Sequence, residues 1–152
     1  MISSRGKYAT RALLHMAQRE GQAPVSIQEI SERQVIPLKF LEQILLTLKQ
    51  AGFVTSRKGP GGGYQLAKSA TKISLGEVVR VFEGPLALVS CASVTRFGEC
   101  GCPHPEVCGL REVWIEARHA LAQVLDLTTF ADIVQRQSHL ETGHHAIHDF
   151  SI

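Results

Sequence analysis

The stretch from Ser26 to Ala67 constrains the fold most, because helix and hairpin signals follow one another there in a recognisable order. Ser26-Ile-Gln-Glu29 has the spacing of a capping box, in which a hydroxyl and a carboxylate satisfy free amides at a helix start. A short helix is predicted from there to about Gln34. After a turn, Pro37 stands where a first helical position tolerates proline, and a longer helix is predicted to run to Ala51.

A basic, glycine-rich hairpin is predicted after this longer helix. Two short β segments near 53–56 and 64–67 are joined by Arg57-Lys-Gly-Pro-Gly-Gly-Gly63. Glycines let the backbone approach a phosphate or enter a narrow groove without Cβ clashes. An amphipathic helix over about 4–19 comes first in the chain. Helix, short helix, turn, longer helix and hairpin is the order of a winged helix-turn-helix.

The second half of the chain predicts further helices around a cysteine-rich loop. Ser74-Leu-Gly-Glu77 is another capping box, opening a helix to about Glu83. A long helix is expected from about Gly109 to Leu125, and its eight apolar positions are more easily buried by a partner helix than within so small a domain. Thr128 is expected to cap a short final helix over 129–136. A disordered tail is expected over 138–152.

These elements together predict a mainly α protein: a winged helix-turn-helix with a two-stranded β wing, plus a long dimerisation helix and a cysteine loop. The predicted parts are the DNA-binding region over 1–84, the cluster-binding loop over 85–109, the dimerisation and terminal helices over 110–137, and the tail. Residues 1–68 hold ten Lys or Arg against four Asp or Glu, whereas residues 69–152 hold six against ten. This asymmetry favours a polyanionic partner for the first half. A cytoplasmic protein without a membrane segment is expected, since no apolar run approaches the roughly 20 residues of a bilayer span and the start lacks a signal-peptide pattern.

The longer helix is expected to bury Leu41, Ile44, Leu45 and Leu48, and base-reading residues are expected opposite this stripe. Gln43 can bond adenine bidentately, Glu42 can accept from a cytosine amine, and Lys39 favours guanine or phosphate. The full set of predicted DNA contacts is Ser4, Lys7, Leu38, Lys39, Glu42, Gln43, Arg57, Lys58 and Gly59. An ordinary amphipathic surface helix is the alternative, and a nucleotide-binding glycine loop is disfavoured because no Lys-Ser/Thr pair follows the glycines.

Four cysteines lie within eighteen residues, at Cys91, Cys100, Cys102 and Cys108, and the rest of the chain has none. Clustered thiolates in a reducing compartment favour metal binding or redox sensing over structural disulfides. Zinc sites usually pair cysteines as Cys-x₂₋₄-Cys, which is absent here. Iron–sulfur clusters accept irregular spacing, particularly near helix starts. Free thiols and zinc stay open as alternatives.

Five motifs together resemble the IscR/NsrR/RirA-type (Rrf-two) family of bacterial transcription regulators. These are Lys7-Tyr-Ala9, Ile30-Ser-Glu-Arg-Gln34, Phe40-Leu-Glu-Gln43, Gly59-Pro-Gly-Gly-Gly-Tyr64 and the cysteine cluster. The resemblance covers about residues 1–137. It implies a homodimeric winged-helix regulator that binds a double-stranded DNA operator and is no enzyme. It also implies that a 2Fe–2S or 4Fe–4S cluster sets operator affinity in response to iron, nitric oxide or redox state.

The resemblance also implies particular ligands. Cys91, Cys102 and Cys108 match the family's three cluster cysteines, with Cys100 as a possible fourth or alternative ligand. Two fourth ligands of the family do not carry over: Arg111 stands where one branch has histidine, and Lys7 where another has a carboxylate from the partner subunit. The remaining pattern is closest to the RirA branch, which implies iron sensing.

Two other functions fit parts of the sequence. One is a cluster-free thiol or zinc redox switch that binds DNA, in which Cys100 and Cys102 oxidise. The other is an iron–sulfur carrier, which leaves the basic glycine-rich hairpin unexplained. A hydrolytic enzyme is least favoured, since no Ser or Cys nucleophile visibly pairs with a base and an orienting acid.

Overall fold

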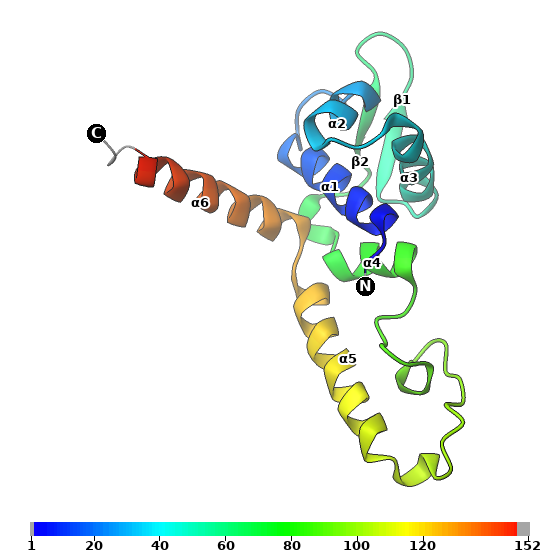
Figure 1. Ribbon diagram of the computed structural model, residues 1–152. Coiled ribbons are helices and arrows are strands. Elements are labelled where there is room, and N and C mark those ends of the chain that lie inside the picture. Colours follow the sequence, from blue (N-terminus) through cyan, green and yellow to red (C-terminus); the bar gives the residue numbers. More distant parts are fainter. Residues whose placement is uncertain (1, 149–152) are drawn as a thin grey trace.

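The computed structural model describes residues 2–148, and its first part is the predicted winged helix-turn-helix (Figure 1). The elements in chain order are α1 (Ser4–Gln18), α2 (Ile27–Gln34), α3 (Leu38–Gln50), β1 (Val54–Arg57), β2 (Gly63–Leu66), the 3₁₀ turn η1 (Ala70–Lys72), α4 (Leu75–Glu83), η2 (Ser90–Ala92), η3 (Pro105–Val107), α5 (Gly109–Leu127) and α6 (Phe130–His148). The predicted mainly helical class with a two-stranded wing is confirmed.

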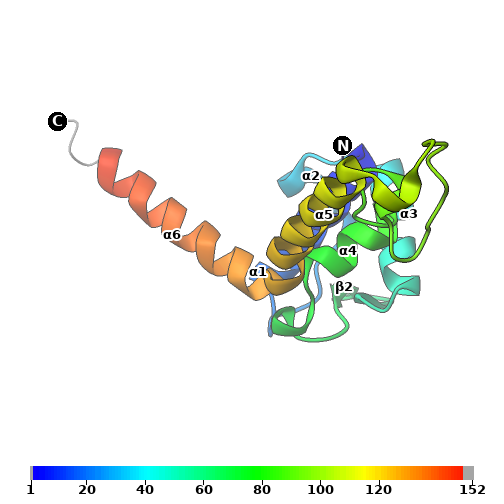
Figure 2. The ribbon, with the colours of Figure 1, turned by 90° about the horizontal axis from the view of Figure 1, so that it is seen from below.

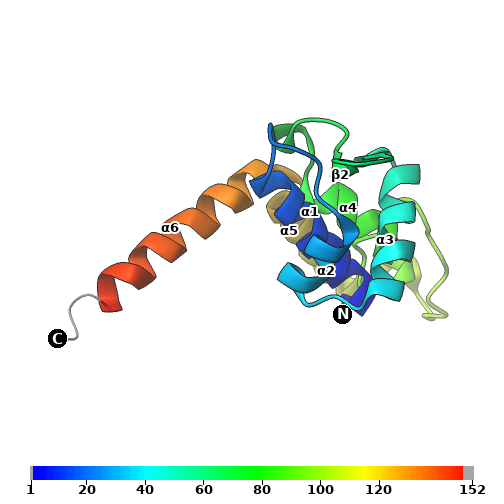
Figure 3. The same ribbon diagram turned by 90° about the horizontal axis from the view of Figure 1, so that it is seen from above.

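The hydrophobic core is organised around α1, which packs against α2, α3, α4 and α6 (Figures 1 and 3). Leu13 of α1 is completely buried. The buried positions of α3 are Leu41, Ile44, Leu45 and Leu48, as its helical periodicity predicts. Because these positions recur every three or four residues, they form one stripe and leave the opposite face of α3 to solvent.

The two predicted capping boxes differ in how completely they form. At α4 both halves are present: Ser74 Oγ accepts from the Glu77 amide, and the Glu77 carboxylate accepts from the Ser74 amide. At α2 only Ser26 caps, accepting from the Glu29 amide at 3.1 Å. The Glu29 carboxylate instead accepts from Arg19 at 2.7 Å, because α1 brings a guanidinium closer than the α2 start. The prediction that the Glu29 carboxylate accepts from the amide at the start of α2 is therefore wrong, whereas the predicted cap by Ser26 is confirmed.

The wing is an antiparallel hairpin in which Val54 pairs with Leu66 and Arg57 with Gly63. A third segment joins it, since Val25 and Tyr64 exchange two backbone hydrogen bonds of 2.8 and 2.7 Å. A Cβ at Gly63 would lie 2.4 Å from the Val25 carbonyl oxygen. Glycine is therefore required there for the close approach of the two backbones.

The chain returns to the core after α5. The Phe130 amide donates to the Ile73 carbonyl at 3.0 Å, and the Phe130 side chain is only 1% exposed. The residue that caps α6 is Thr129 rather than the predicted Thr128, since the Asp132 amide donates to Thr129 Oγ1. The core therefore combines residues of the N-terminal helix α1 with the first residue of the last helix, α6.

The last helix is longer than predicted. α6 runs to His148, so the predicted helix end at Arg136 and the disordered tail from Ser138 are wrong as far as His148. Helix-compatible residues continue past Arg136, and a bond of 2.8 Å from Gln137 to Glu141 supports the exposed turns. Residues 149–152 of the predicted tail lie outside the described chain.

An apolar stripe on α5 is left without a partner in the described chain. α5 packs against α4 and η2 with one face, on which Arg111, Arg118 and Ala122 are half-buried (Figure 2). On the other side, Leu110, Val113, Ala117, Ala120, Val124 and Leu127 recur at alternating spacings of three and four. These six residues are called the α5 stripe. Their heptad spacing is the pattern of a helix that pairs with another helix.

Among the described residues no helix is both long enough and apolar enough to cross a bilayer.

Candidate nucleic-acid interface and cysteine site

The outer face of α3 carries the predicted base-reading residues. Lys39, Glu42 and Gln43 are all exposed, and Leu38 is 41% exposed. Thr47, one turn further along the same face, has a hydroxyl that donates to the Gln43 carbonyl at 3.0 Å and is therefore occupied within the helix. The helix therefore presents one cation, one anion, one amide and one apolar group side by side, which is a set able to distinguish base edges in a major groove.

The start of α1 lies against this face. Arg5, Lys39, Phe40 and Gln43 line one shallow hollow, which brings the first turn of α1 beside α3. Phe40 was not among the predicted contacts, yet it is 54% exposed and its ring meets Tyr8 edge-on at 6.4 Å. The sequence could have indicated this exposure, because Phe40 precedes the buried Leu41 and therefore lies on the polar side of the helix. Its apolar edge can contact a thymine methyl group.

A carboxylate occupies the α1 N-terminus. Ser3 is the N-cap, and its Oγ accepts from the Gly6 amide at 3.1 Å. Glu83 of α4 accepts from the Ser3 amide at 3.1 Å and from the Ser3 hydroxyl at 2.6 Å. Negative charge is favourable at this end of a helix, so Glu83 occupies a position at which a phosphate could otherwise bind. Ser4 and Lys7 are exposed beside it.

The tip of the wing carries the remaining predicted contacts. Arg57, Lys58 and Gly59 are exposed. α2, α3 and the wing lie at one end of the molecule, while α5 and the cysteine loop lie at the other (Figure 1). None of the predicted cations Lys7, Lys39, Arg57 and Lys58 forms an ion pair within the described chain, so their charge is available to phosphates.

The segment around Cys91 is held by two arginines of α5. Arg111 Nε donates to the Cys91 carbonyl at 2.9 Å, and Arg118 Nη1 donates to the Ala92 carbonyl at 2.7 Å. Cys91 is itself buried within the turn η2. The backbone on both sides of this thiol is therefore tied to the long helix by charged hydrogen bonds.

The other three cysteines lie on the loop that leads into α5. Cys100 and Cys102 are exposed, and Cys108 is half-buried directly before the first residue of α5. Cys91, Cys100 and Cys102 line a cavity of about 280 Å³ that also includes Phe97 and Arg111. The structure therefore brings Cys100 onto the same wall as two of the predicted ligands.

The pKa values of the thiols record which of them are neighbours. A hydrogen bond from the Cys102 thiol lowers the pKa of Cys100. The same contact, with partial desolvation and the charges of Cys100 and Cys108, raises the pKa of Cys102 to about 11. Burial raises the pKa of Cys91, and the charge of Cys100 adds to that increase. These shifts follow from the proximity of Cys91, Cys100 and Cys102 on one cavity wall.

This donor set fits a cluster better than a single ion. No three His, Cys, Asp or Glu side chains of the described chain are grouped as ligands of one metal ion. Three thiols around one cavity, with Cys108 directly before α5, suit a larger inorganic group, because the cysteines that ligate an iron–sulfur cluster are divided among two or more iron atoms. The exposed His104 lies 3.7 Å from Glu106 and faces solvent, so it is outside this set.

The fold and these two sites define a winged-helix DNA-binding protein with a cysteine-rich loop beside a long helix. Residues 2–136 match the Rrf2 family model, described as an iron-dependent transcriptional regulator. The chain is 39% identical over 137 residues to protein rrf2 of Nitratidesulfovibrio vulgaris, covering 90% of this chain and 89% of that protein. It belongs to the Rrf2 family of transcriptional regulators.

Two solved structures show the same fold. CymR, described as the global cysteine regulator of B. subtilis, superposes with a TM-score of 0.75 at 31% identity, covering 90% of this chain and 97% of that one. IscR of T. potens superposes with a TM-score of 0.72 at 31% identity, covering 90% and 88%.

Proposed function

We propose that this chain is a homodimeric operator-binding regulator whose DNA affinity depends on an iron–sulfur cluster held by Cys91, Cys102 and Cys108, with Cys100 as fourth or alternative ligand. The observation that carries the proposal is the gathering of Cys91, Cys100 and Cys102 around one cavity, with the Cys91 backbone held by Arg111 of α5 and Cys108 directly before this helix. Bound there, a 2Fe–2S or 4Fe–4S cluster would supply a redox-active and iron-dependent charge.

DNA is proposed to be read by α3 and gripped by the wing. Lys39 and the exposed amide of Gln43 face the bases, while Arg57 and Lys58 neutralise phosphates. Pairing of two α5 stripes would set two copies of α3 about 34 Å apart, one turn of DNA, facing a pseudo-palindromic operator.

The chain offers a physical route from the cysteines to the DNA-binding face. The cysteine loop follows directly after α4, whose Glu83 holds the first turn of α1 through Ser3. That turn adjoins α3 through Arg5 and Lys39. A change at the thiols can move the end of α4 and the start of α1 together. A coupling of about 1–3 kcal/mol would change operator affinity roughly 5- to 150-fold.

Anaerobic purification followed by iron and sulfide assays tests the cofactor. Operator titrations of the cluster-containing and cluster-free protein then test its effect. A colourless, iron-free preparation, or equal operator affinity of both forms, would contradict the proposal. Single Cys→Ser replacements at positions 100 and 102 show which thiol the cluster needs.

Two variants of α3 test the reading of DNA. Lys39→Ala is expected to weaken binding to all sequences, because it removes a phosphate-attracting charge. Glu42→Ala is expected to relax preference at one base pair by about 1–3 kcal/mol. Competition titrations with operator and scrambled duplexes measure both. Identical behaviour of the two variants would show that α3 is not the base-reading helix.

A thiol switch without iron is the second candidate function. The contiguity of Cys91, Cys100 and Cys102 on one cavity wall favours it, as does the similarity to CymR. Oxidation of two thiolates to a disulfide would release two electrons to an oxidant such as a peroxide. Operator affinity that changes with peroxide in iron-free protein, and is restored by a dithiol, would support this function over the cluster.

A further inference from the structure

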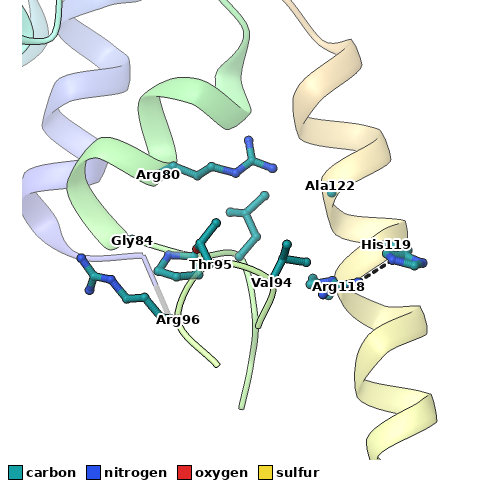
Figure 4. A pocket seen from close by; sticks show the side chains of 10 residues that line it. Arg80, Gly84, Val94, Thr95, Arg96, Arg118, His119 and Ala122 are labelled. Carbon is teal, nitrogen blue, oxygen red and sulfur yellow. Dashed lines mark hydrogen bonds between the residues drawn. The ribbon is translucent and has the colours of Figure 1, made fainter. Parts of the chain in front are cut away.

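A second cavity lies between α4, the segment after Cys91 and α5, with a volume of about 380 Å³ (Figure 4). It is separate from the cysteine cavity and shares no lining residue with it. Val94 and Ala122 supply apolar wall, while Arg80, Arg96, Arg118 and His119 supply polar groups. This volume is at the lower end of the range for small-molecule sites, about 300–1,000 Å³.

The cavity wall carries positive charge that the described chain does not fully neutralise. No acidic residue of the described chain lines the cavity. Arg80 is paired with Asp126, whose Oδ2 accepts from Arg80 Nη2 at 2.8 Å, although Asp126 does not line the cavity. Arg118 bonds the His119 ring (Figure 4), and its only other partner among the described residues is the neutral Ala92 carbonyl. The side chain of Arg96 has no hydrogen-bond acceptor among the described residues. Guanidinium groups in this state favour an anionic ligand.

The cavity remains open when the α5 stripe is covered. At 100° per residue, Arg118 and Ala122 lie on the side of α5 that faces α4. The stripe residues Val113 and Val124 lie on the opposite side and are 56% and 62% exposed. A partner helix on the stripe would therefore not fill the cavity.

We propose that this cavity binds a small organic anion, with a carboxylate or phosphate group on a short aliphatic body. The anionic group would be received by Arg118, and the body would lie against Val94 and Ala122 (Figure 4). Arg118 also holds the Ala92 carbonyl, next to Cys91. The ligand and the segment around Cys91 would therefore both bind the guanidinium of Arg118. Because of this shared contact, binding of the anion would affect the position of Cys91, and the position of Cys91 would affect the affinity for the anion.

Calorimetric titration of the cluster-free dimer, without DNA, tests the site. The probes are succinate and glycerol 3-phosphate, with butane-1,4-diol as a neutral control at the same ionic strength. At least one anion is expected to bind once per protomer, and the diol is not. The better of the two anions identifies the preferred charged group.

Variants locate the binding. Arg118→Gln removes the charge. Ala122→Glu keeps Arg118 but places a carboxylate four residues further along α5, where it competes with the ligand for the guanidinium. Each is expected to weaken anion binding at least tenfold. Arg136→Gln removes the same charge from an exposed position on α6 and is expected to change nothing.

Three results would overturn the proposal. They are the absence of binding by both anions, unchanged binding in both cavity variants, and loss of binding in Lys39→Gln, which would place the anion on the DNA-binding face. All are measured without iron and without operator. A failure here therefore leaves the cluster proposal standing, and a failure of the cluster proposal leaves this one standing.

Discussion

Replacing Val124 with aspartate is predicted to separate the dimer, because this residue is one of the large, exposed residues of the α5 stripe. The large stripe residues Leu110, Val113, Val124 and Leu127 are 71, 56, 62 and 78% exposed in the single chain. Complete burial of such a side chain contributes about 1.5–3 kcal/mol, so the exposed part offers about 1–2 kcal/mol for each. Eight side chains in a dimer then offer about 8–16 kcal/mol, against an association cost of about 4–15 kcal/mol.

This balance leaves the dimer little reserve. Val124→Asp removes about 2 kcal/mol of apolar burial over two protomers, and enclosing two like charges costs several kcal/mol more. The dimer dissociation constant is therefore expected to rise at least about 1,000-fold, which corresponds to about 4 kcal/mol. Sedimentation equilibrium over a concentration series measures this change directly.

Gln123→Asp is the matched control. It adds the same charge one residue away, on the polar side of α5 where Gln123 is exposed. This variant is expected to remain dimeric, and circular dichroism checks that both variants are folded. The reasoning is refuted if Val124→Asp dimerises as tightly as the unmodified chain, or if Gln123→Asp dissociates equally.

Three further predictions concern single contacts. Arg111→Gln should raise the alkylation rate of Cys91 about tenfold in a chain whose other cysteines are serine, because one charged hydrogen bond to the Cys91 carbonyl is lost. Arg111 also lowers the pKa of this thiol, so its loss alone would slow alkylation; an unchanged or slower rate would contradict the anchoring role. Glu83→Gln should lower the free energy of unfolding in urea by about 1 kcal/mol, because the carboxylate at the α1 start and its bonds to Ser3 are weakened; a change near zero would mean that the contact is solvated away. Asp126→Asn should lower stability by no more than about 1 kcal/mol at neutral pH, since the ion pair is exposed. A hydrogen bond from its arginine partner lowers the pKa of Asp126, so the contribution is complete above the ordinary carboxyl pKa and is lost as pH falls below it; thermal unfolding in acid should show the two proteins converging.

The helices with strong apolar periodicity were predicted closely. The sequence identified all four buried positions of α3, and it placed α4 from its capping box at Ser74. These signals depend on residues within one or two turns of each other, so the chain reports them locally. The ion pair of Glu29 could not be predicted in this way, because its partner Arg19 belongs to another helix.

The length of α6 was missed for a related reason. Beyond Arg136 the sequence has weak periodicity, which usually indicates irregular structure. The first turn is fixed by the burial of Phe130 and by the Thr129 cap, and the helix then continues through residues that do not oppose it. The contacts of Phe130 and Thr129 at the start of α6 therefore allowed the rest of this segment to be helical.

The grouping of the four cysteines was only half visible in the sequence. Their spacing indicated a thiolate site, but Cys100 fitted no standard pair. The loop folds so that Cys100 interacts with both Cys91 and Cys102, which are separated from it by very different lengths of chain. Only the path of the loop could show this arrangement.

The sequence by itself determined the order of the elements, the apolar face of each helix and the gathering of cations in the first half of the chain. These follow from short-range periodicity and composition. Tertiary structure alone decided that Glu83 binds the N-cap Ser3 of α1, that two arginines of α5 hold the Cys91 segment, and that a positively charged cavity lies behind it. Such contacts depend on the angles at which helices pack, and those angles are set by the whole core rather than by any one segment.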